Sequence, residues 1–366
     1  MIGSERSAYL FLSLLQARTG SSLISRLGEL PPSSILEMSA KELAARVKMT
    51  DRAARSFDSL RHDFDPDAIV ERLTEKGITV LTPADEGYPE RLTEMPDPPP
   101  ALFMDGALPQ GPTVAIVGSR KASPTGLGVA RSLGRTLGER GVCVVSGLAL
   151  GVDAASHQGA LDGGGPTVGV LGSGIDVVYP RSNRRLFDNV RDNGAIISEY
   201  YLGEEPLAWR FPARNRIIAG LGDVLVVVEA AEKSGALITA RHALDAGGDV
   251  WAAPGPPGVP ECRGSNKLLA DGAGVLWDIP EFVESIAPEP IRESGKKTAE
   301  PHIPEELPEN EARALAGVGF ESTPVDVAAG RSGMAVQELL SALTLLELKG
   351  YVERDEAGAF LRRSVG

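Results

Sequence analysis

The chain of 366 residues lacks several features that would assign it to a common functional class. It has only two cysteines, Cys143 in an apolar run and Cys262 in a Gly/Pro-rich loop. Two such distant residues are typical of reduced thiols rather than of a disulfide or a metal pair. The four histidines form no HxH or HExxH motif. We therefore predict no metal site.

Long apolar runs are also missing. No stretch reaches the roughly eighteen residues that a membrane helix requires. The N-terminus lacks the basic, apolar and small-residue segments of a signal peptide. We therefore expect a cytoplasmic protein with no membrane partner. Length and composition are those of a globular protein of two or three domains.

The chain has no overall excess of positive charge, since its net charge is −13. Residues 1–111 carry 12 basic and 17 acidic side chains, whereas residues 112–275 carry 16 of each. A neutral domain can still form a positive groove where its arginines cluster, because the local field governs contact with phosphates. The sequence therefore permits nucleic-acid binding only in a confined groove.

The pattern of apolar residues predicts an α/β domain between two smaller ones. Residues 1–75 show helical periodicity, and the segment 18–47 resembles the helix pairs of sterile-alpha-motif or helix-hairpin-helix domains, with generic helix packing as the alternative. Residues 281–306, rich in Glu and Pro, predict an acidic flexible linker. Residues 307–366 predict three helices and a hairpin with its turn near Glu356 to Gly358, which together form a winged helix.

The central domain, residues 76–280, alternates short apolar runs with helical segments. This order predicts a doubly wound parallel sheet with helices on both faces and ligands at the carboxyl ends of the strands. The predicted strands are 113–117, 142–146, 167–171, 195–198, 223–228 and 249–253, and the predicted helices lie near 125–139, 152–162, 183–192, 214–220 and 235–246. The prolines of residues 88–106 predict an ordered connection without strand or helix.

The first of these strands leads into the predicted site. It ends at Gly118, Ser119 and Arg120, just before a helix. Gly118 lets the backbone approach a ligand, Ser119 adds a hydroxyl, and Arg120 places a permanent cation beside the helix N-terminus. This chemistry favours an anion, most simply a phosphate. Neither GxGxxG nor GxxxxGK[ST] is present, so we predict no NAD, FAD or ATP and no other cofactor.

Polar side chains follow the next two strands at the same edge. Asp153 and His157 lie one helical turn apart, which suits either a structural cap with a packed histidine or a site role. Arg181 and Arg184 lie on either side of Asn183 at a helix start. These arginines form either a solvated basic face or contacts with a phosphate backbone.

Arginines and an aromatic residue follow the fourth strand. Phe211 lies between Arg210 and Arg214, and Asn215 and Arg216 come next. Arginines with an interleaved ring are typical of a single-strand groove, where cations contact phosphates and the ring stacks on a base. The alternative is that Phe211 belongs to the core. After the fifth strand, Ser234 and Gly235 at a helix N-terminus suit either an anion or simple capping.

Six segments resemble, in order, the signature segments of the DprA/Smf family of bacterial DNA-processing proteins. They are GSRKASPTG, SGLALGVDAASHQGAL, VLGSGIDVVYPRSNRRL, SEYYLGEEPLAWRFPARNRIIAGL, VVEAAEKSGALITARHAL and APGPPGVPECRGSNKLLADGA. The resemblance implies an extended Rossmann-like domain that binds and protects single-stranded DNA and loads the RecA recombinase onto it during natural transformation. The predicted DNA-binding residues are Gly118, Ser119, Arg120, Arg181, Asn183, Arg184, Phe211, Arg214, Asn215, Arg216, Ser234 and Gly235, with no catalytic residue.

An enzymatic alternative comes from the cytokinin-activating phosphoribohydrolases, whose fold is similar. Their PGGxGTxxE loop carries the glutamate of the reaction, whereas the corresponding segment here, KSGALITARHA, has no carboxylate. This difference favours binding over nucleotide processing. A duplex-binding regulator is a third possibility and depends on the C-terminal winged helix alone.

The winged helix and the dimer interface are the last predictions. The presumed recognition helix, about 335–349, carries Glu338 and Glu347, with Lys349 as its cation. A major-groove reader normally presents Arg, Lys, Asn or Gln, so we favour protein contact over duplex binding. The family resemblance also implies a homodimer through the central domain, near a sheet edge. Its candidate residues, which could equally pack inside the protomer, are Leu268, Leu269, Leu276 and Trp277.

Overall fold

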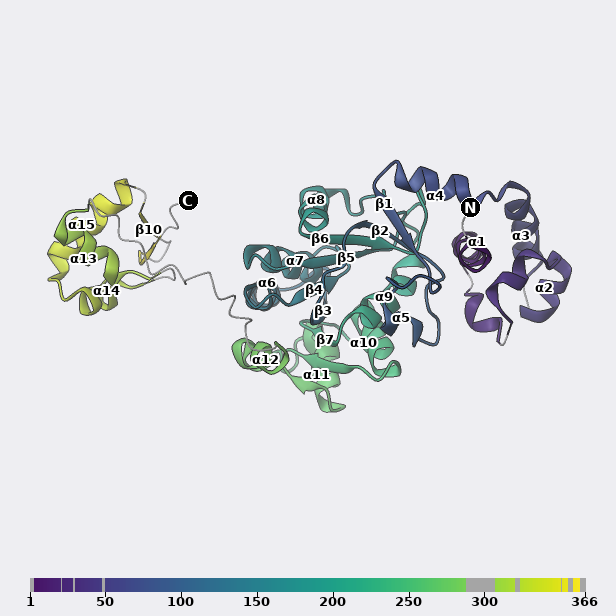
Figure 1. The fold of residues 1–366 in the computed structure, drawn as a ribbon. Helices are drawn as coiled ribbons and strands as arrows, with labels where there is room; N and C mark the ends of the chain where they lie inside the picture. Colours follow the sequence, from purple (N-terminus) through teal and green to yellow (C-terminus); the bar gives the residue numbers. More distant parts are fainter. Residues whose placement is uncertain are drawn as a thin grey trace. The chain divides into compact units, whose positions relative to one another are not determined.

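The structure is a computed structural model that describes residues 3–20, 22–28, 30–47, 50–287, 307–319, 323–349, 351–354 and 358–362. The chain divides into two compact units, Met1–Pro290 and Ile291–Gly366. The first holds the helical N-terminal region and the large sheet, and the second is a small domain of three helices and a hairpin (Figure 1).

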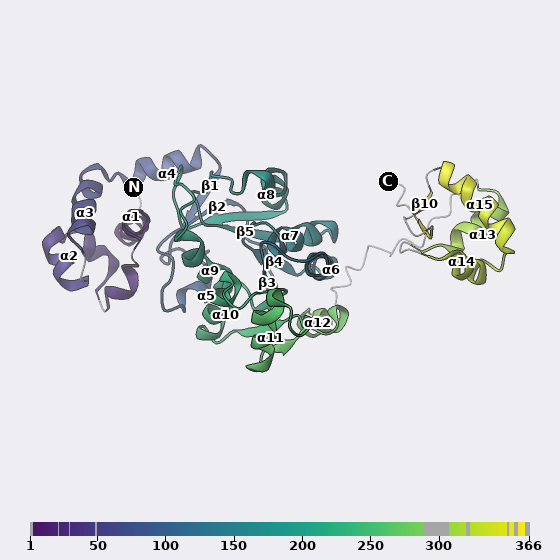
Figure 2. The ribbon, with the colours of Figure 1, turned by 180° about the vertical axis from the view of Figure 1, so that it is seen from behind.

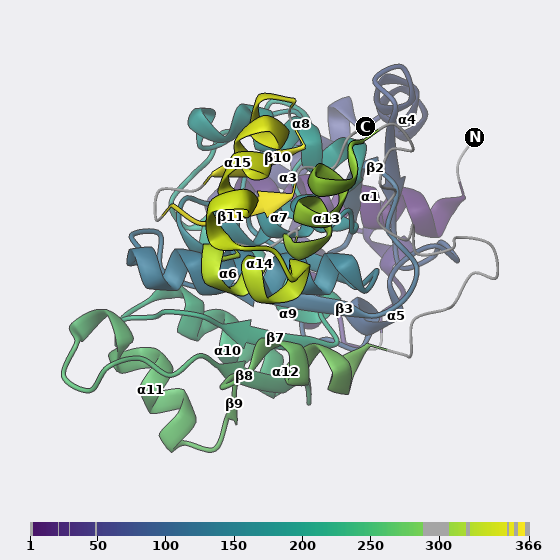
Figure 3. The same ribbon diagram turned by 90° about the vertical axis from the view of Figure 1, so that its left-hand side faces the viewer.

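One nine-stranded sheet organises the first unit, in the order β1-β2-β6-β5-β4-β3-β7-β8-β9. Its strands are β1 Ile78–Leu81, β2 Leu102–Gly106, β3 Thr113–Val117, β4 Cys143–Ser146, β5 Thr167–Leu171, β6 Gly194–Ser198, β7 Val224–Val227, β8 Asp249–Ala252 and β9 Gly274–Val275. In the order of the sheet, each neighbouring pair from β6 through β5, β4, β3, β7 and β8 to β9 is parallel. The strand β2 pairs with β6 in the antiparallel direction. Figure 3 shows β3, β7, β8 and β9 following one another towards one edge.

The six predicted strands are confirmed, but the proline-rich segment 88–106 is more regular than predicted. It contains the helix α5, Glu90–Thr93, and the strand β2. The last of its prolines precedes Ala101, so no proline interrupts the β2 ladder. Leu102 and Phe103 are fully buried. The prediction was wrong because it judged an apolar run by the prolines before it.

Side chains of β3 alternate between two cores, as a buried strand requires. Val114 and Ile116 pack with the helices α6 and α7, whereas Ala115 and Val117 face α9 and α10. Figures 1 and 2 show α6, α7 and α8 on one side of the sheet and α9 and α10 on the other. The predicted doubly wound α/β fold is confirmed. These helices are α6 Pro124–Glu139, α7 Val152–Asp162, α8 Arg184–Asp192, α9 Arg210–Leu221 and α10 Gly235–Asp245.

The N-terminal region is helical, as predicted. It contains α1 Ser4–Thr19, α2 Ala40–Val47, α3 Asp51–Asp63 and α4 Pro66–Thr74, with short 3-10 helices at Ile24–Arg26 and Pro32–Leu36. Phe11 packs edge-on against Phe57 and Phe64, with ring centroids 5.2 and 5.1 Å away. Leu10 of α1 and Leu73 of α4 instead join the cluster around Phe103 of the sheet. This region therefore shares a core with the sheet.

The sheet domain extends further along the chain than predicted. After α11, Arg263–Ala270, the helix α12, Ile279–Ile286, buries Phe282 and Val283 against the core on the α6 side. The first residues of the predicted linker 281–306 therefore belong to α12, and residues 288–306 lie outside the described part. Among the described residues, no helix is both long and apolar enough to cross a membrane.

The second unit has the predicted winged-helix elements. They are α13 Glu309–Gly317, α14 Val325–Ser332, α15 Val336–Leu348 and the antiparallel strands β10 Val352–Arg354 and β11 Phe360–Arg362. Thr323 forms a bridge to Phe360 and extends the small sheet. Most of the predicted turn, near Glu356 to Gly358, lies outside the described residues.

Candidate nucleic-acid interface

A pocket of about 410 Å³ lies at the carboxyl edge of the sheet, beside the end of β3. The chain leaves β3 through α6 to β4 on one side, whereas β7 pairs with the other side of β3. In open α/β sheets this reversal of strand order is where ligands bind. The predicted site residues that line the pocket are Gly118, Ser119, Arg120, Arg214, Asn215, Ser234 and Gly235.

The loop after β3 is fixed by backbone contacts. The Ser119 amide donates to the Glu229 carbonyl oxygen (2.7 Å), and the Ser119 carbonyl accepts from the Val152 amide (3.1 Å). A Cβ atom at Gly118 would lie 2.6 Å from a methyl carbon of Val152. Glycine is therefore needed at Gly118 so that α7 can approach, and this packing role differs from the ligand approach that we predicted.

The N-terminus of α6 already holds an anion of the protein itself. Ser123 caps the helix through the Gly126 amide (3.0 Å), and the carboxylate of Glu229 accepts from the Ser123 amide (3.0 Å). Glu229 is buried. A ligand phosphate therefore has no place at this helix end, where the sequence predicted one. Glu229 was missed, although its position at the end of the fifth predicted strand was a usable signal.

The other side of the pocket is the start of α10. The Ser234 hydroxyl accepts from the Ala236 amide (3.2 Å), and Gly235 is exposed. Asn215 connects α9 to this turn, because its side-chain amide donates to the Gly235 carbonyl (3.3 Å). Lys233, which the prediction missed, adds an exposed cation to the lining. The pocket lining thus includes a capped helix start and a lysine in addition to Arg120.

Arg214 forms the buried floor of the pocket. Its Nη1 atom donates to the carbonyl oxygens of Gly147 (2.9 Å) and Val170, just after β4 and within β5. Burial lowers the pKa of Arg214 to about 10, while Asp153 opposes the change. Burial likewise raises the pKa of the Asp153 carboxyl, against the effect of Arg214. Arg214 therefore stays charged at neutral pH and holds two strand ends together.

His157 belongs to the scaffold. The Thr167 hydroxyl donates to the Val144 carbonyl (2.7 Å), and His157 Nδ1 lies 2.7 Å from the same hydroxyl oxygen. The ring nitrogen is therefore the donor in this contact. Burial lowers the pKa of His157 to about 3, so the imidazole is neutral at physiological pH.

Phe211 is not among the residues that line the pocket, but its ring contacts Arg120 of the lining. The Arg120 guanidinium carbon lies 5.2 Å from the Phe211 ring centroid, within cation–π distance. Tyr179 lies on another side of Phe211, with ring centroids 5.4 Å apart, and is 45% exposed. Phe211 is half-buried because its ring packs closely on Gly172. The aromatic surface therefore contains Tyr179 as well, which the sequence analysis missed.

The predicted residues after β5 lie outside the pocket lining. Arg181 and Arg184 are exposed, and Arg184 lies 3.7 Å from Asp188 one turn along α8. Asn183 donates from its side-chain amide to the Leu148 carbonyl (3.0 Å), in the loop that leads to Ala149 of the pocket. Asn183 thus holds the loop that leads to Ala149 of the pocket. Arg181 and Arg184 are exposed and lie within two residues of Asn183 in the sequence.

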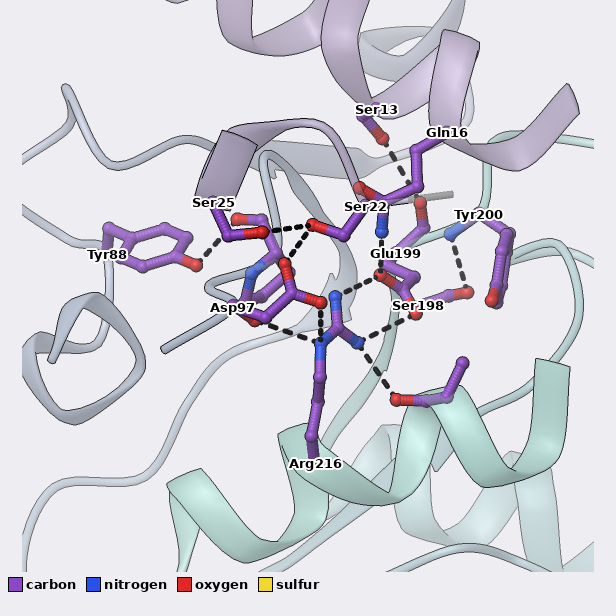
Figure 4. Close-up of polar contacts among 12 residues, drawn as sticks. Ser13, Gln16, Ser22, Ser25, Tyr88, Asp97, Ser198, Glu199, Tyr200 and Arg216 are labelled. Atoms are coloured by element: carbon purple, nitrogen blue, oxygen red, sulfur yellow. Dashed lines mark hydrogen bonds and ion pairs between the residues drawn. The ribbon is translucent and has the colours of Figure 1, made fainter. Parts of the chain in front are cut away.

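Arg216 is absent from the pocket lining, and its guanidinium points towards Glu199 and Asp97 (Figure 4). Its guanidinium is buried and makes a bidentate ion pair with Glu199, at 3.0 and 2.7 Å. Its Nε atom donates to the Asp97 carbonyl (3.0 Å), and Glu199 also accepts from Gln16 of α1 (3.2 Å). Arg216 thus connects α9 to the N-terminal region. We leave it out of the proposed DNA contacts for this reason.

Comparisons with known proteins agree with the motifs. The family model of DNA recombination-mediator protein A matches residues 79–287, and that of the DprA winged helix domain matches residues 298–358. Protein Smf of Synechocystis sp. is 34% identical over 337 residues, which cover 83% of this chain and 85% of that protein.

Two solved structures are similar to this one. DNA processing protein A (DprA) from Streptococcus pneumoniae has a TM-score of 0.63 and 32% identity, covering 78% of this chain and 98% of that chain. DNA processing protein A from Helicobacter pylori, whose structure concerns its single-stranded DNA binding mode, has a TM-score of 0.52 and 31% identity, covering 57% and 94%. The resemblance stated from the sequence is confirmed, and this chain belongs to the DNA recombination-mediator protein A (DprA) family.

Proposed function

We propose that this chain binds single-stranded DNA without reading its sequence, protects it, and loads the RecA recombinase onto it during natural transformation. The observation that carries the proposal is the contact between Arg120, which lines the pocket, and the ring of Phe211 beside it. A cation beside a ring provides one phosphate contact and one stacking surface. The relative from Helicobacter pylori binds single-stranded DNA, which supports the same ligand here.

We also propose that the chain is a binding protein and not an enzyme. Among the described residues that line the pocket, Asp153 is the one that has a carboxylate side chain. Asp153 is buried beside Arg214 and accepts a hydrogen bond from the Ala149 amide (3.4 Å). At the start of α10 the pocket presents Ser234 and Thr239, and hydroxyls there suit anion binding. The nucleotide-processing alternative therefore gains no support from this arrangement.

The test is a titration of labelled single- and double-stranded oligonucleotides with wild-type protein and Arg120→Glu. We expect wild-type protein to prefer single strands. Arg120→Glu should abolish this binding with folding intact, because a repulsive charge replaces the cation of the pocket lining. Arg140→Glu is a matched control, since Arg140 is exposed at the far end of α6. Equal affinities of Arg120→Glu and wild type would contradict the proposal.

We further propose that the chain forms a homodimer through the β9 edge. Trp277 is 69% exposed and Val275 is 44% exposed, whereas Leu276 is buried. Leu268 and Leu269 pack against the core of their own protomer. The proposed interface therefore centres on Trp277 and Val275.

For the winged helix we propose contact with another protein. Lys349 is paired with Glu311 (2.6 Å), so the cation at the end of α15 has a partner within its own domain. Val336 and Leu345 of α15 are 50% and 45% exposed. Apolar exposure and a paired cation suit a protein surface better than the phosphates of a duplex.

A further inference from the structure

A second pocket, of about 380 Å³, lies between the N-terminal helices and the start of α9. Its lining includes Arg18 and Gly20 at the end of α1, Thr50 at the start of α3, and Leu207 and Trp209 just before α9. An aromatic ring, an arginine and a hydroxyl within one hollow are the groups that accommodate a nucleotide in non-specific single-strand binding.

Trp209 is the wall of this pocket that can stack. It is 40% exposed, and its ring lies edge-on to Tyr200 at 6.2 Å. The Arg210 guanidinium carbon lies 5.3 Å from the Trp209 ring centroid. A Cβ atom at Gly20 would lie 3.7 Å from the six-membered ring. The indole is thus held from several sides and still exposed, which is the state of a preorganised stacking platform.

Charge at this pocket also suits a phosphate. Arg18 is exposed in the last turn of α1. Of the acidic residues near the lining, Glu204 is paired with the buried Arg210 at 2.7 Å, whereas Glu205 and Asp51 are exposed; Arg210 also donates to the Ala17 carbonyl (3.1 Å). The backbone carbonyl of Glu205 accepts a hydrogen bond from Arg210 (2.8 Å), which helps to hold Arg210 in place. Arg18 therefore supplies a cation of the lining that is available to a ligand.

A residue of the second pocket and a residue beside the first pocket are neighbours at the start of α9. Trp209 is the N-cap of α9 and Phe211 is two residues later, so their Cα atoms are at most about 7.6 Å apart. Phe211 faces Arg120 and the first pocket, while Trp209 faces the N-terminal helices. A strand that leaves Phe211 in the direction of these helices therefore meets Trp209.

We propose that single-stranded DNA continues from Phe211 over the start of α9 into the second pocket, where a base stacks on Trp209 and Arg18 contacts a phosphate. This inference rests on the proposed function, because it extends the same binding path. It also assigns a role to the N-terminal helical region, which completes the site with residues from α1 and α3.

The test measures affinity for poly-dT oligonucleotides of increasing length, from about 4 to about 16 nucleotides. With the shortest strands, Trp209→Ala and Arg18→Gln should bind as wild type does. With longer strands, each variant should bind about five- to a hundredfold more weakly, because the additional contact is lost. Trp209→Phe and Arg18→Lys should restore most of the affinity, and Arg140→Glu should bind as wild type.

Fluorescence gives a second measurement that does not require Trp209 to be replaced. With Trp251→Phe and Trp277→Phe, Trp209 is the remaining tryptophan of the three, and long but not short strands should quench it. If wild-type protein binds strands and Arg120→Glu does not, but Arg18→Gln matches wild type at every length and Trp209 emission is constant, this inference fails and the proposed function stands. Absence of any strand binding by wild type overturns both.

Discussion

Replacing Arg216 by methionine should destabilise the sheet domain strongly and leave DNA affinity unchanged. The side chains of Arg216 and Glu199 are only 6% and 2% exposed. Without the guanidinium, Glu199 keeps the hydrogen bond from Gln16 and loses both of its short contacts to Arg216. Removing one partner of a buried ion pair typically costs about 3–5 kcal/mol, because the other charge stays buried and unpaired.

Thermal unfolding at pH 7 measures this cost. For a domain somewhat larger than 200 residues, about 1 kcal/mol corresponds to roughly 2–4 °C of Tm, so we expect Tm to fall by about 6–20 °C. Adding Glu199→Gln to Arg216→Met should recover part of the loss, since the double variant has no buried charge at this position. Lys267→Met is the control, because Lys267 pairs with Asp271 on the surface.

Two results would refute this reasoning. A loss of less than about 1 kcal/mol would mean that water reaches Glu199 and that the pair behaves like a surface ion pair. If folded Arg216→Met binds single strands more weakly and with a smaller salt dependence, Arg216 contacts DNA. That result would contradict a purely structural role for its contacts with Glu199 and Asp97.

Three further predictions concern the site, the scaffold and the assembly. Phe211→Ala should weaken binding of mixed and pyrimidine strands by roughly ten- to a hundredfold with a nearly unchanged salt slope; wild-type affinity together with a lowered Tm would place Phe211 in the core. Between about pH 6.5 and pH 5, unfolded His157 takes up a proton that the folded imidazole, whose pKa burial lowers to about 3, does not. The free energy of unfolding should therefore decrease as the pH is lowered, by up to about 1.4 kcal/mol per pH unit. The decrease should be steeper in wild-type protein than in His157→Gln. Trp277→Asp should convert a dimer of wild-type protein to a monomer in light scattering; a monomeric wild type at micromolar concentration would contradict the proposed interface.

The strands from β3 to β8 could be predicted because each is a short apolar run between helical segments. The start of α9 could not be predicted in the same way. We placed it near Arg214, although it begins at Arg210 and has Pro212 as its third residue. Pro212 lies in the first turn, where the backbone amide has no helical partner and proline is tolerated.

The site was predicted in part, for a related reason. Arg214 and Arg216 are two residues apart, which looked like one basic cluster. On a helix such a pair points in nearly opposite directions, and only Arg214 lines the pocket. The periodicity was visible in the sequence, but its use required knowing that α9 begins before Phe211. The position of Glu229 after a predicted strand was a usable signal, but its contact with Ser123, in a distant segment, had no local signal.

Two acidic residues at the pocket are buried, which helps a chain with a net charge of −13 to present cations there. The Glu229 carboxylate accepts a hydrogen bond from Ser123 at the N-terminus of α6, and Asp153 lies buried beside Arg214. Arg120 and Lys233 remain exposed at the same pocket. At physiological ionic strength the screening length is about 8 Å, so a strand in the pocket responds to these nearby cations, and acidic segments beyond that distance contribute little. At about 0.01 M salt the length grows to roughly 30 Å, and repulsion from the acidic remainder should then oppose the usual gain in affinity. Binding that strengthens without limit as salt is removed would show that the field of the whole chain, and not the pocket, governs recognition.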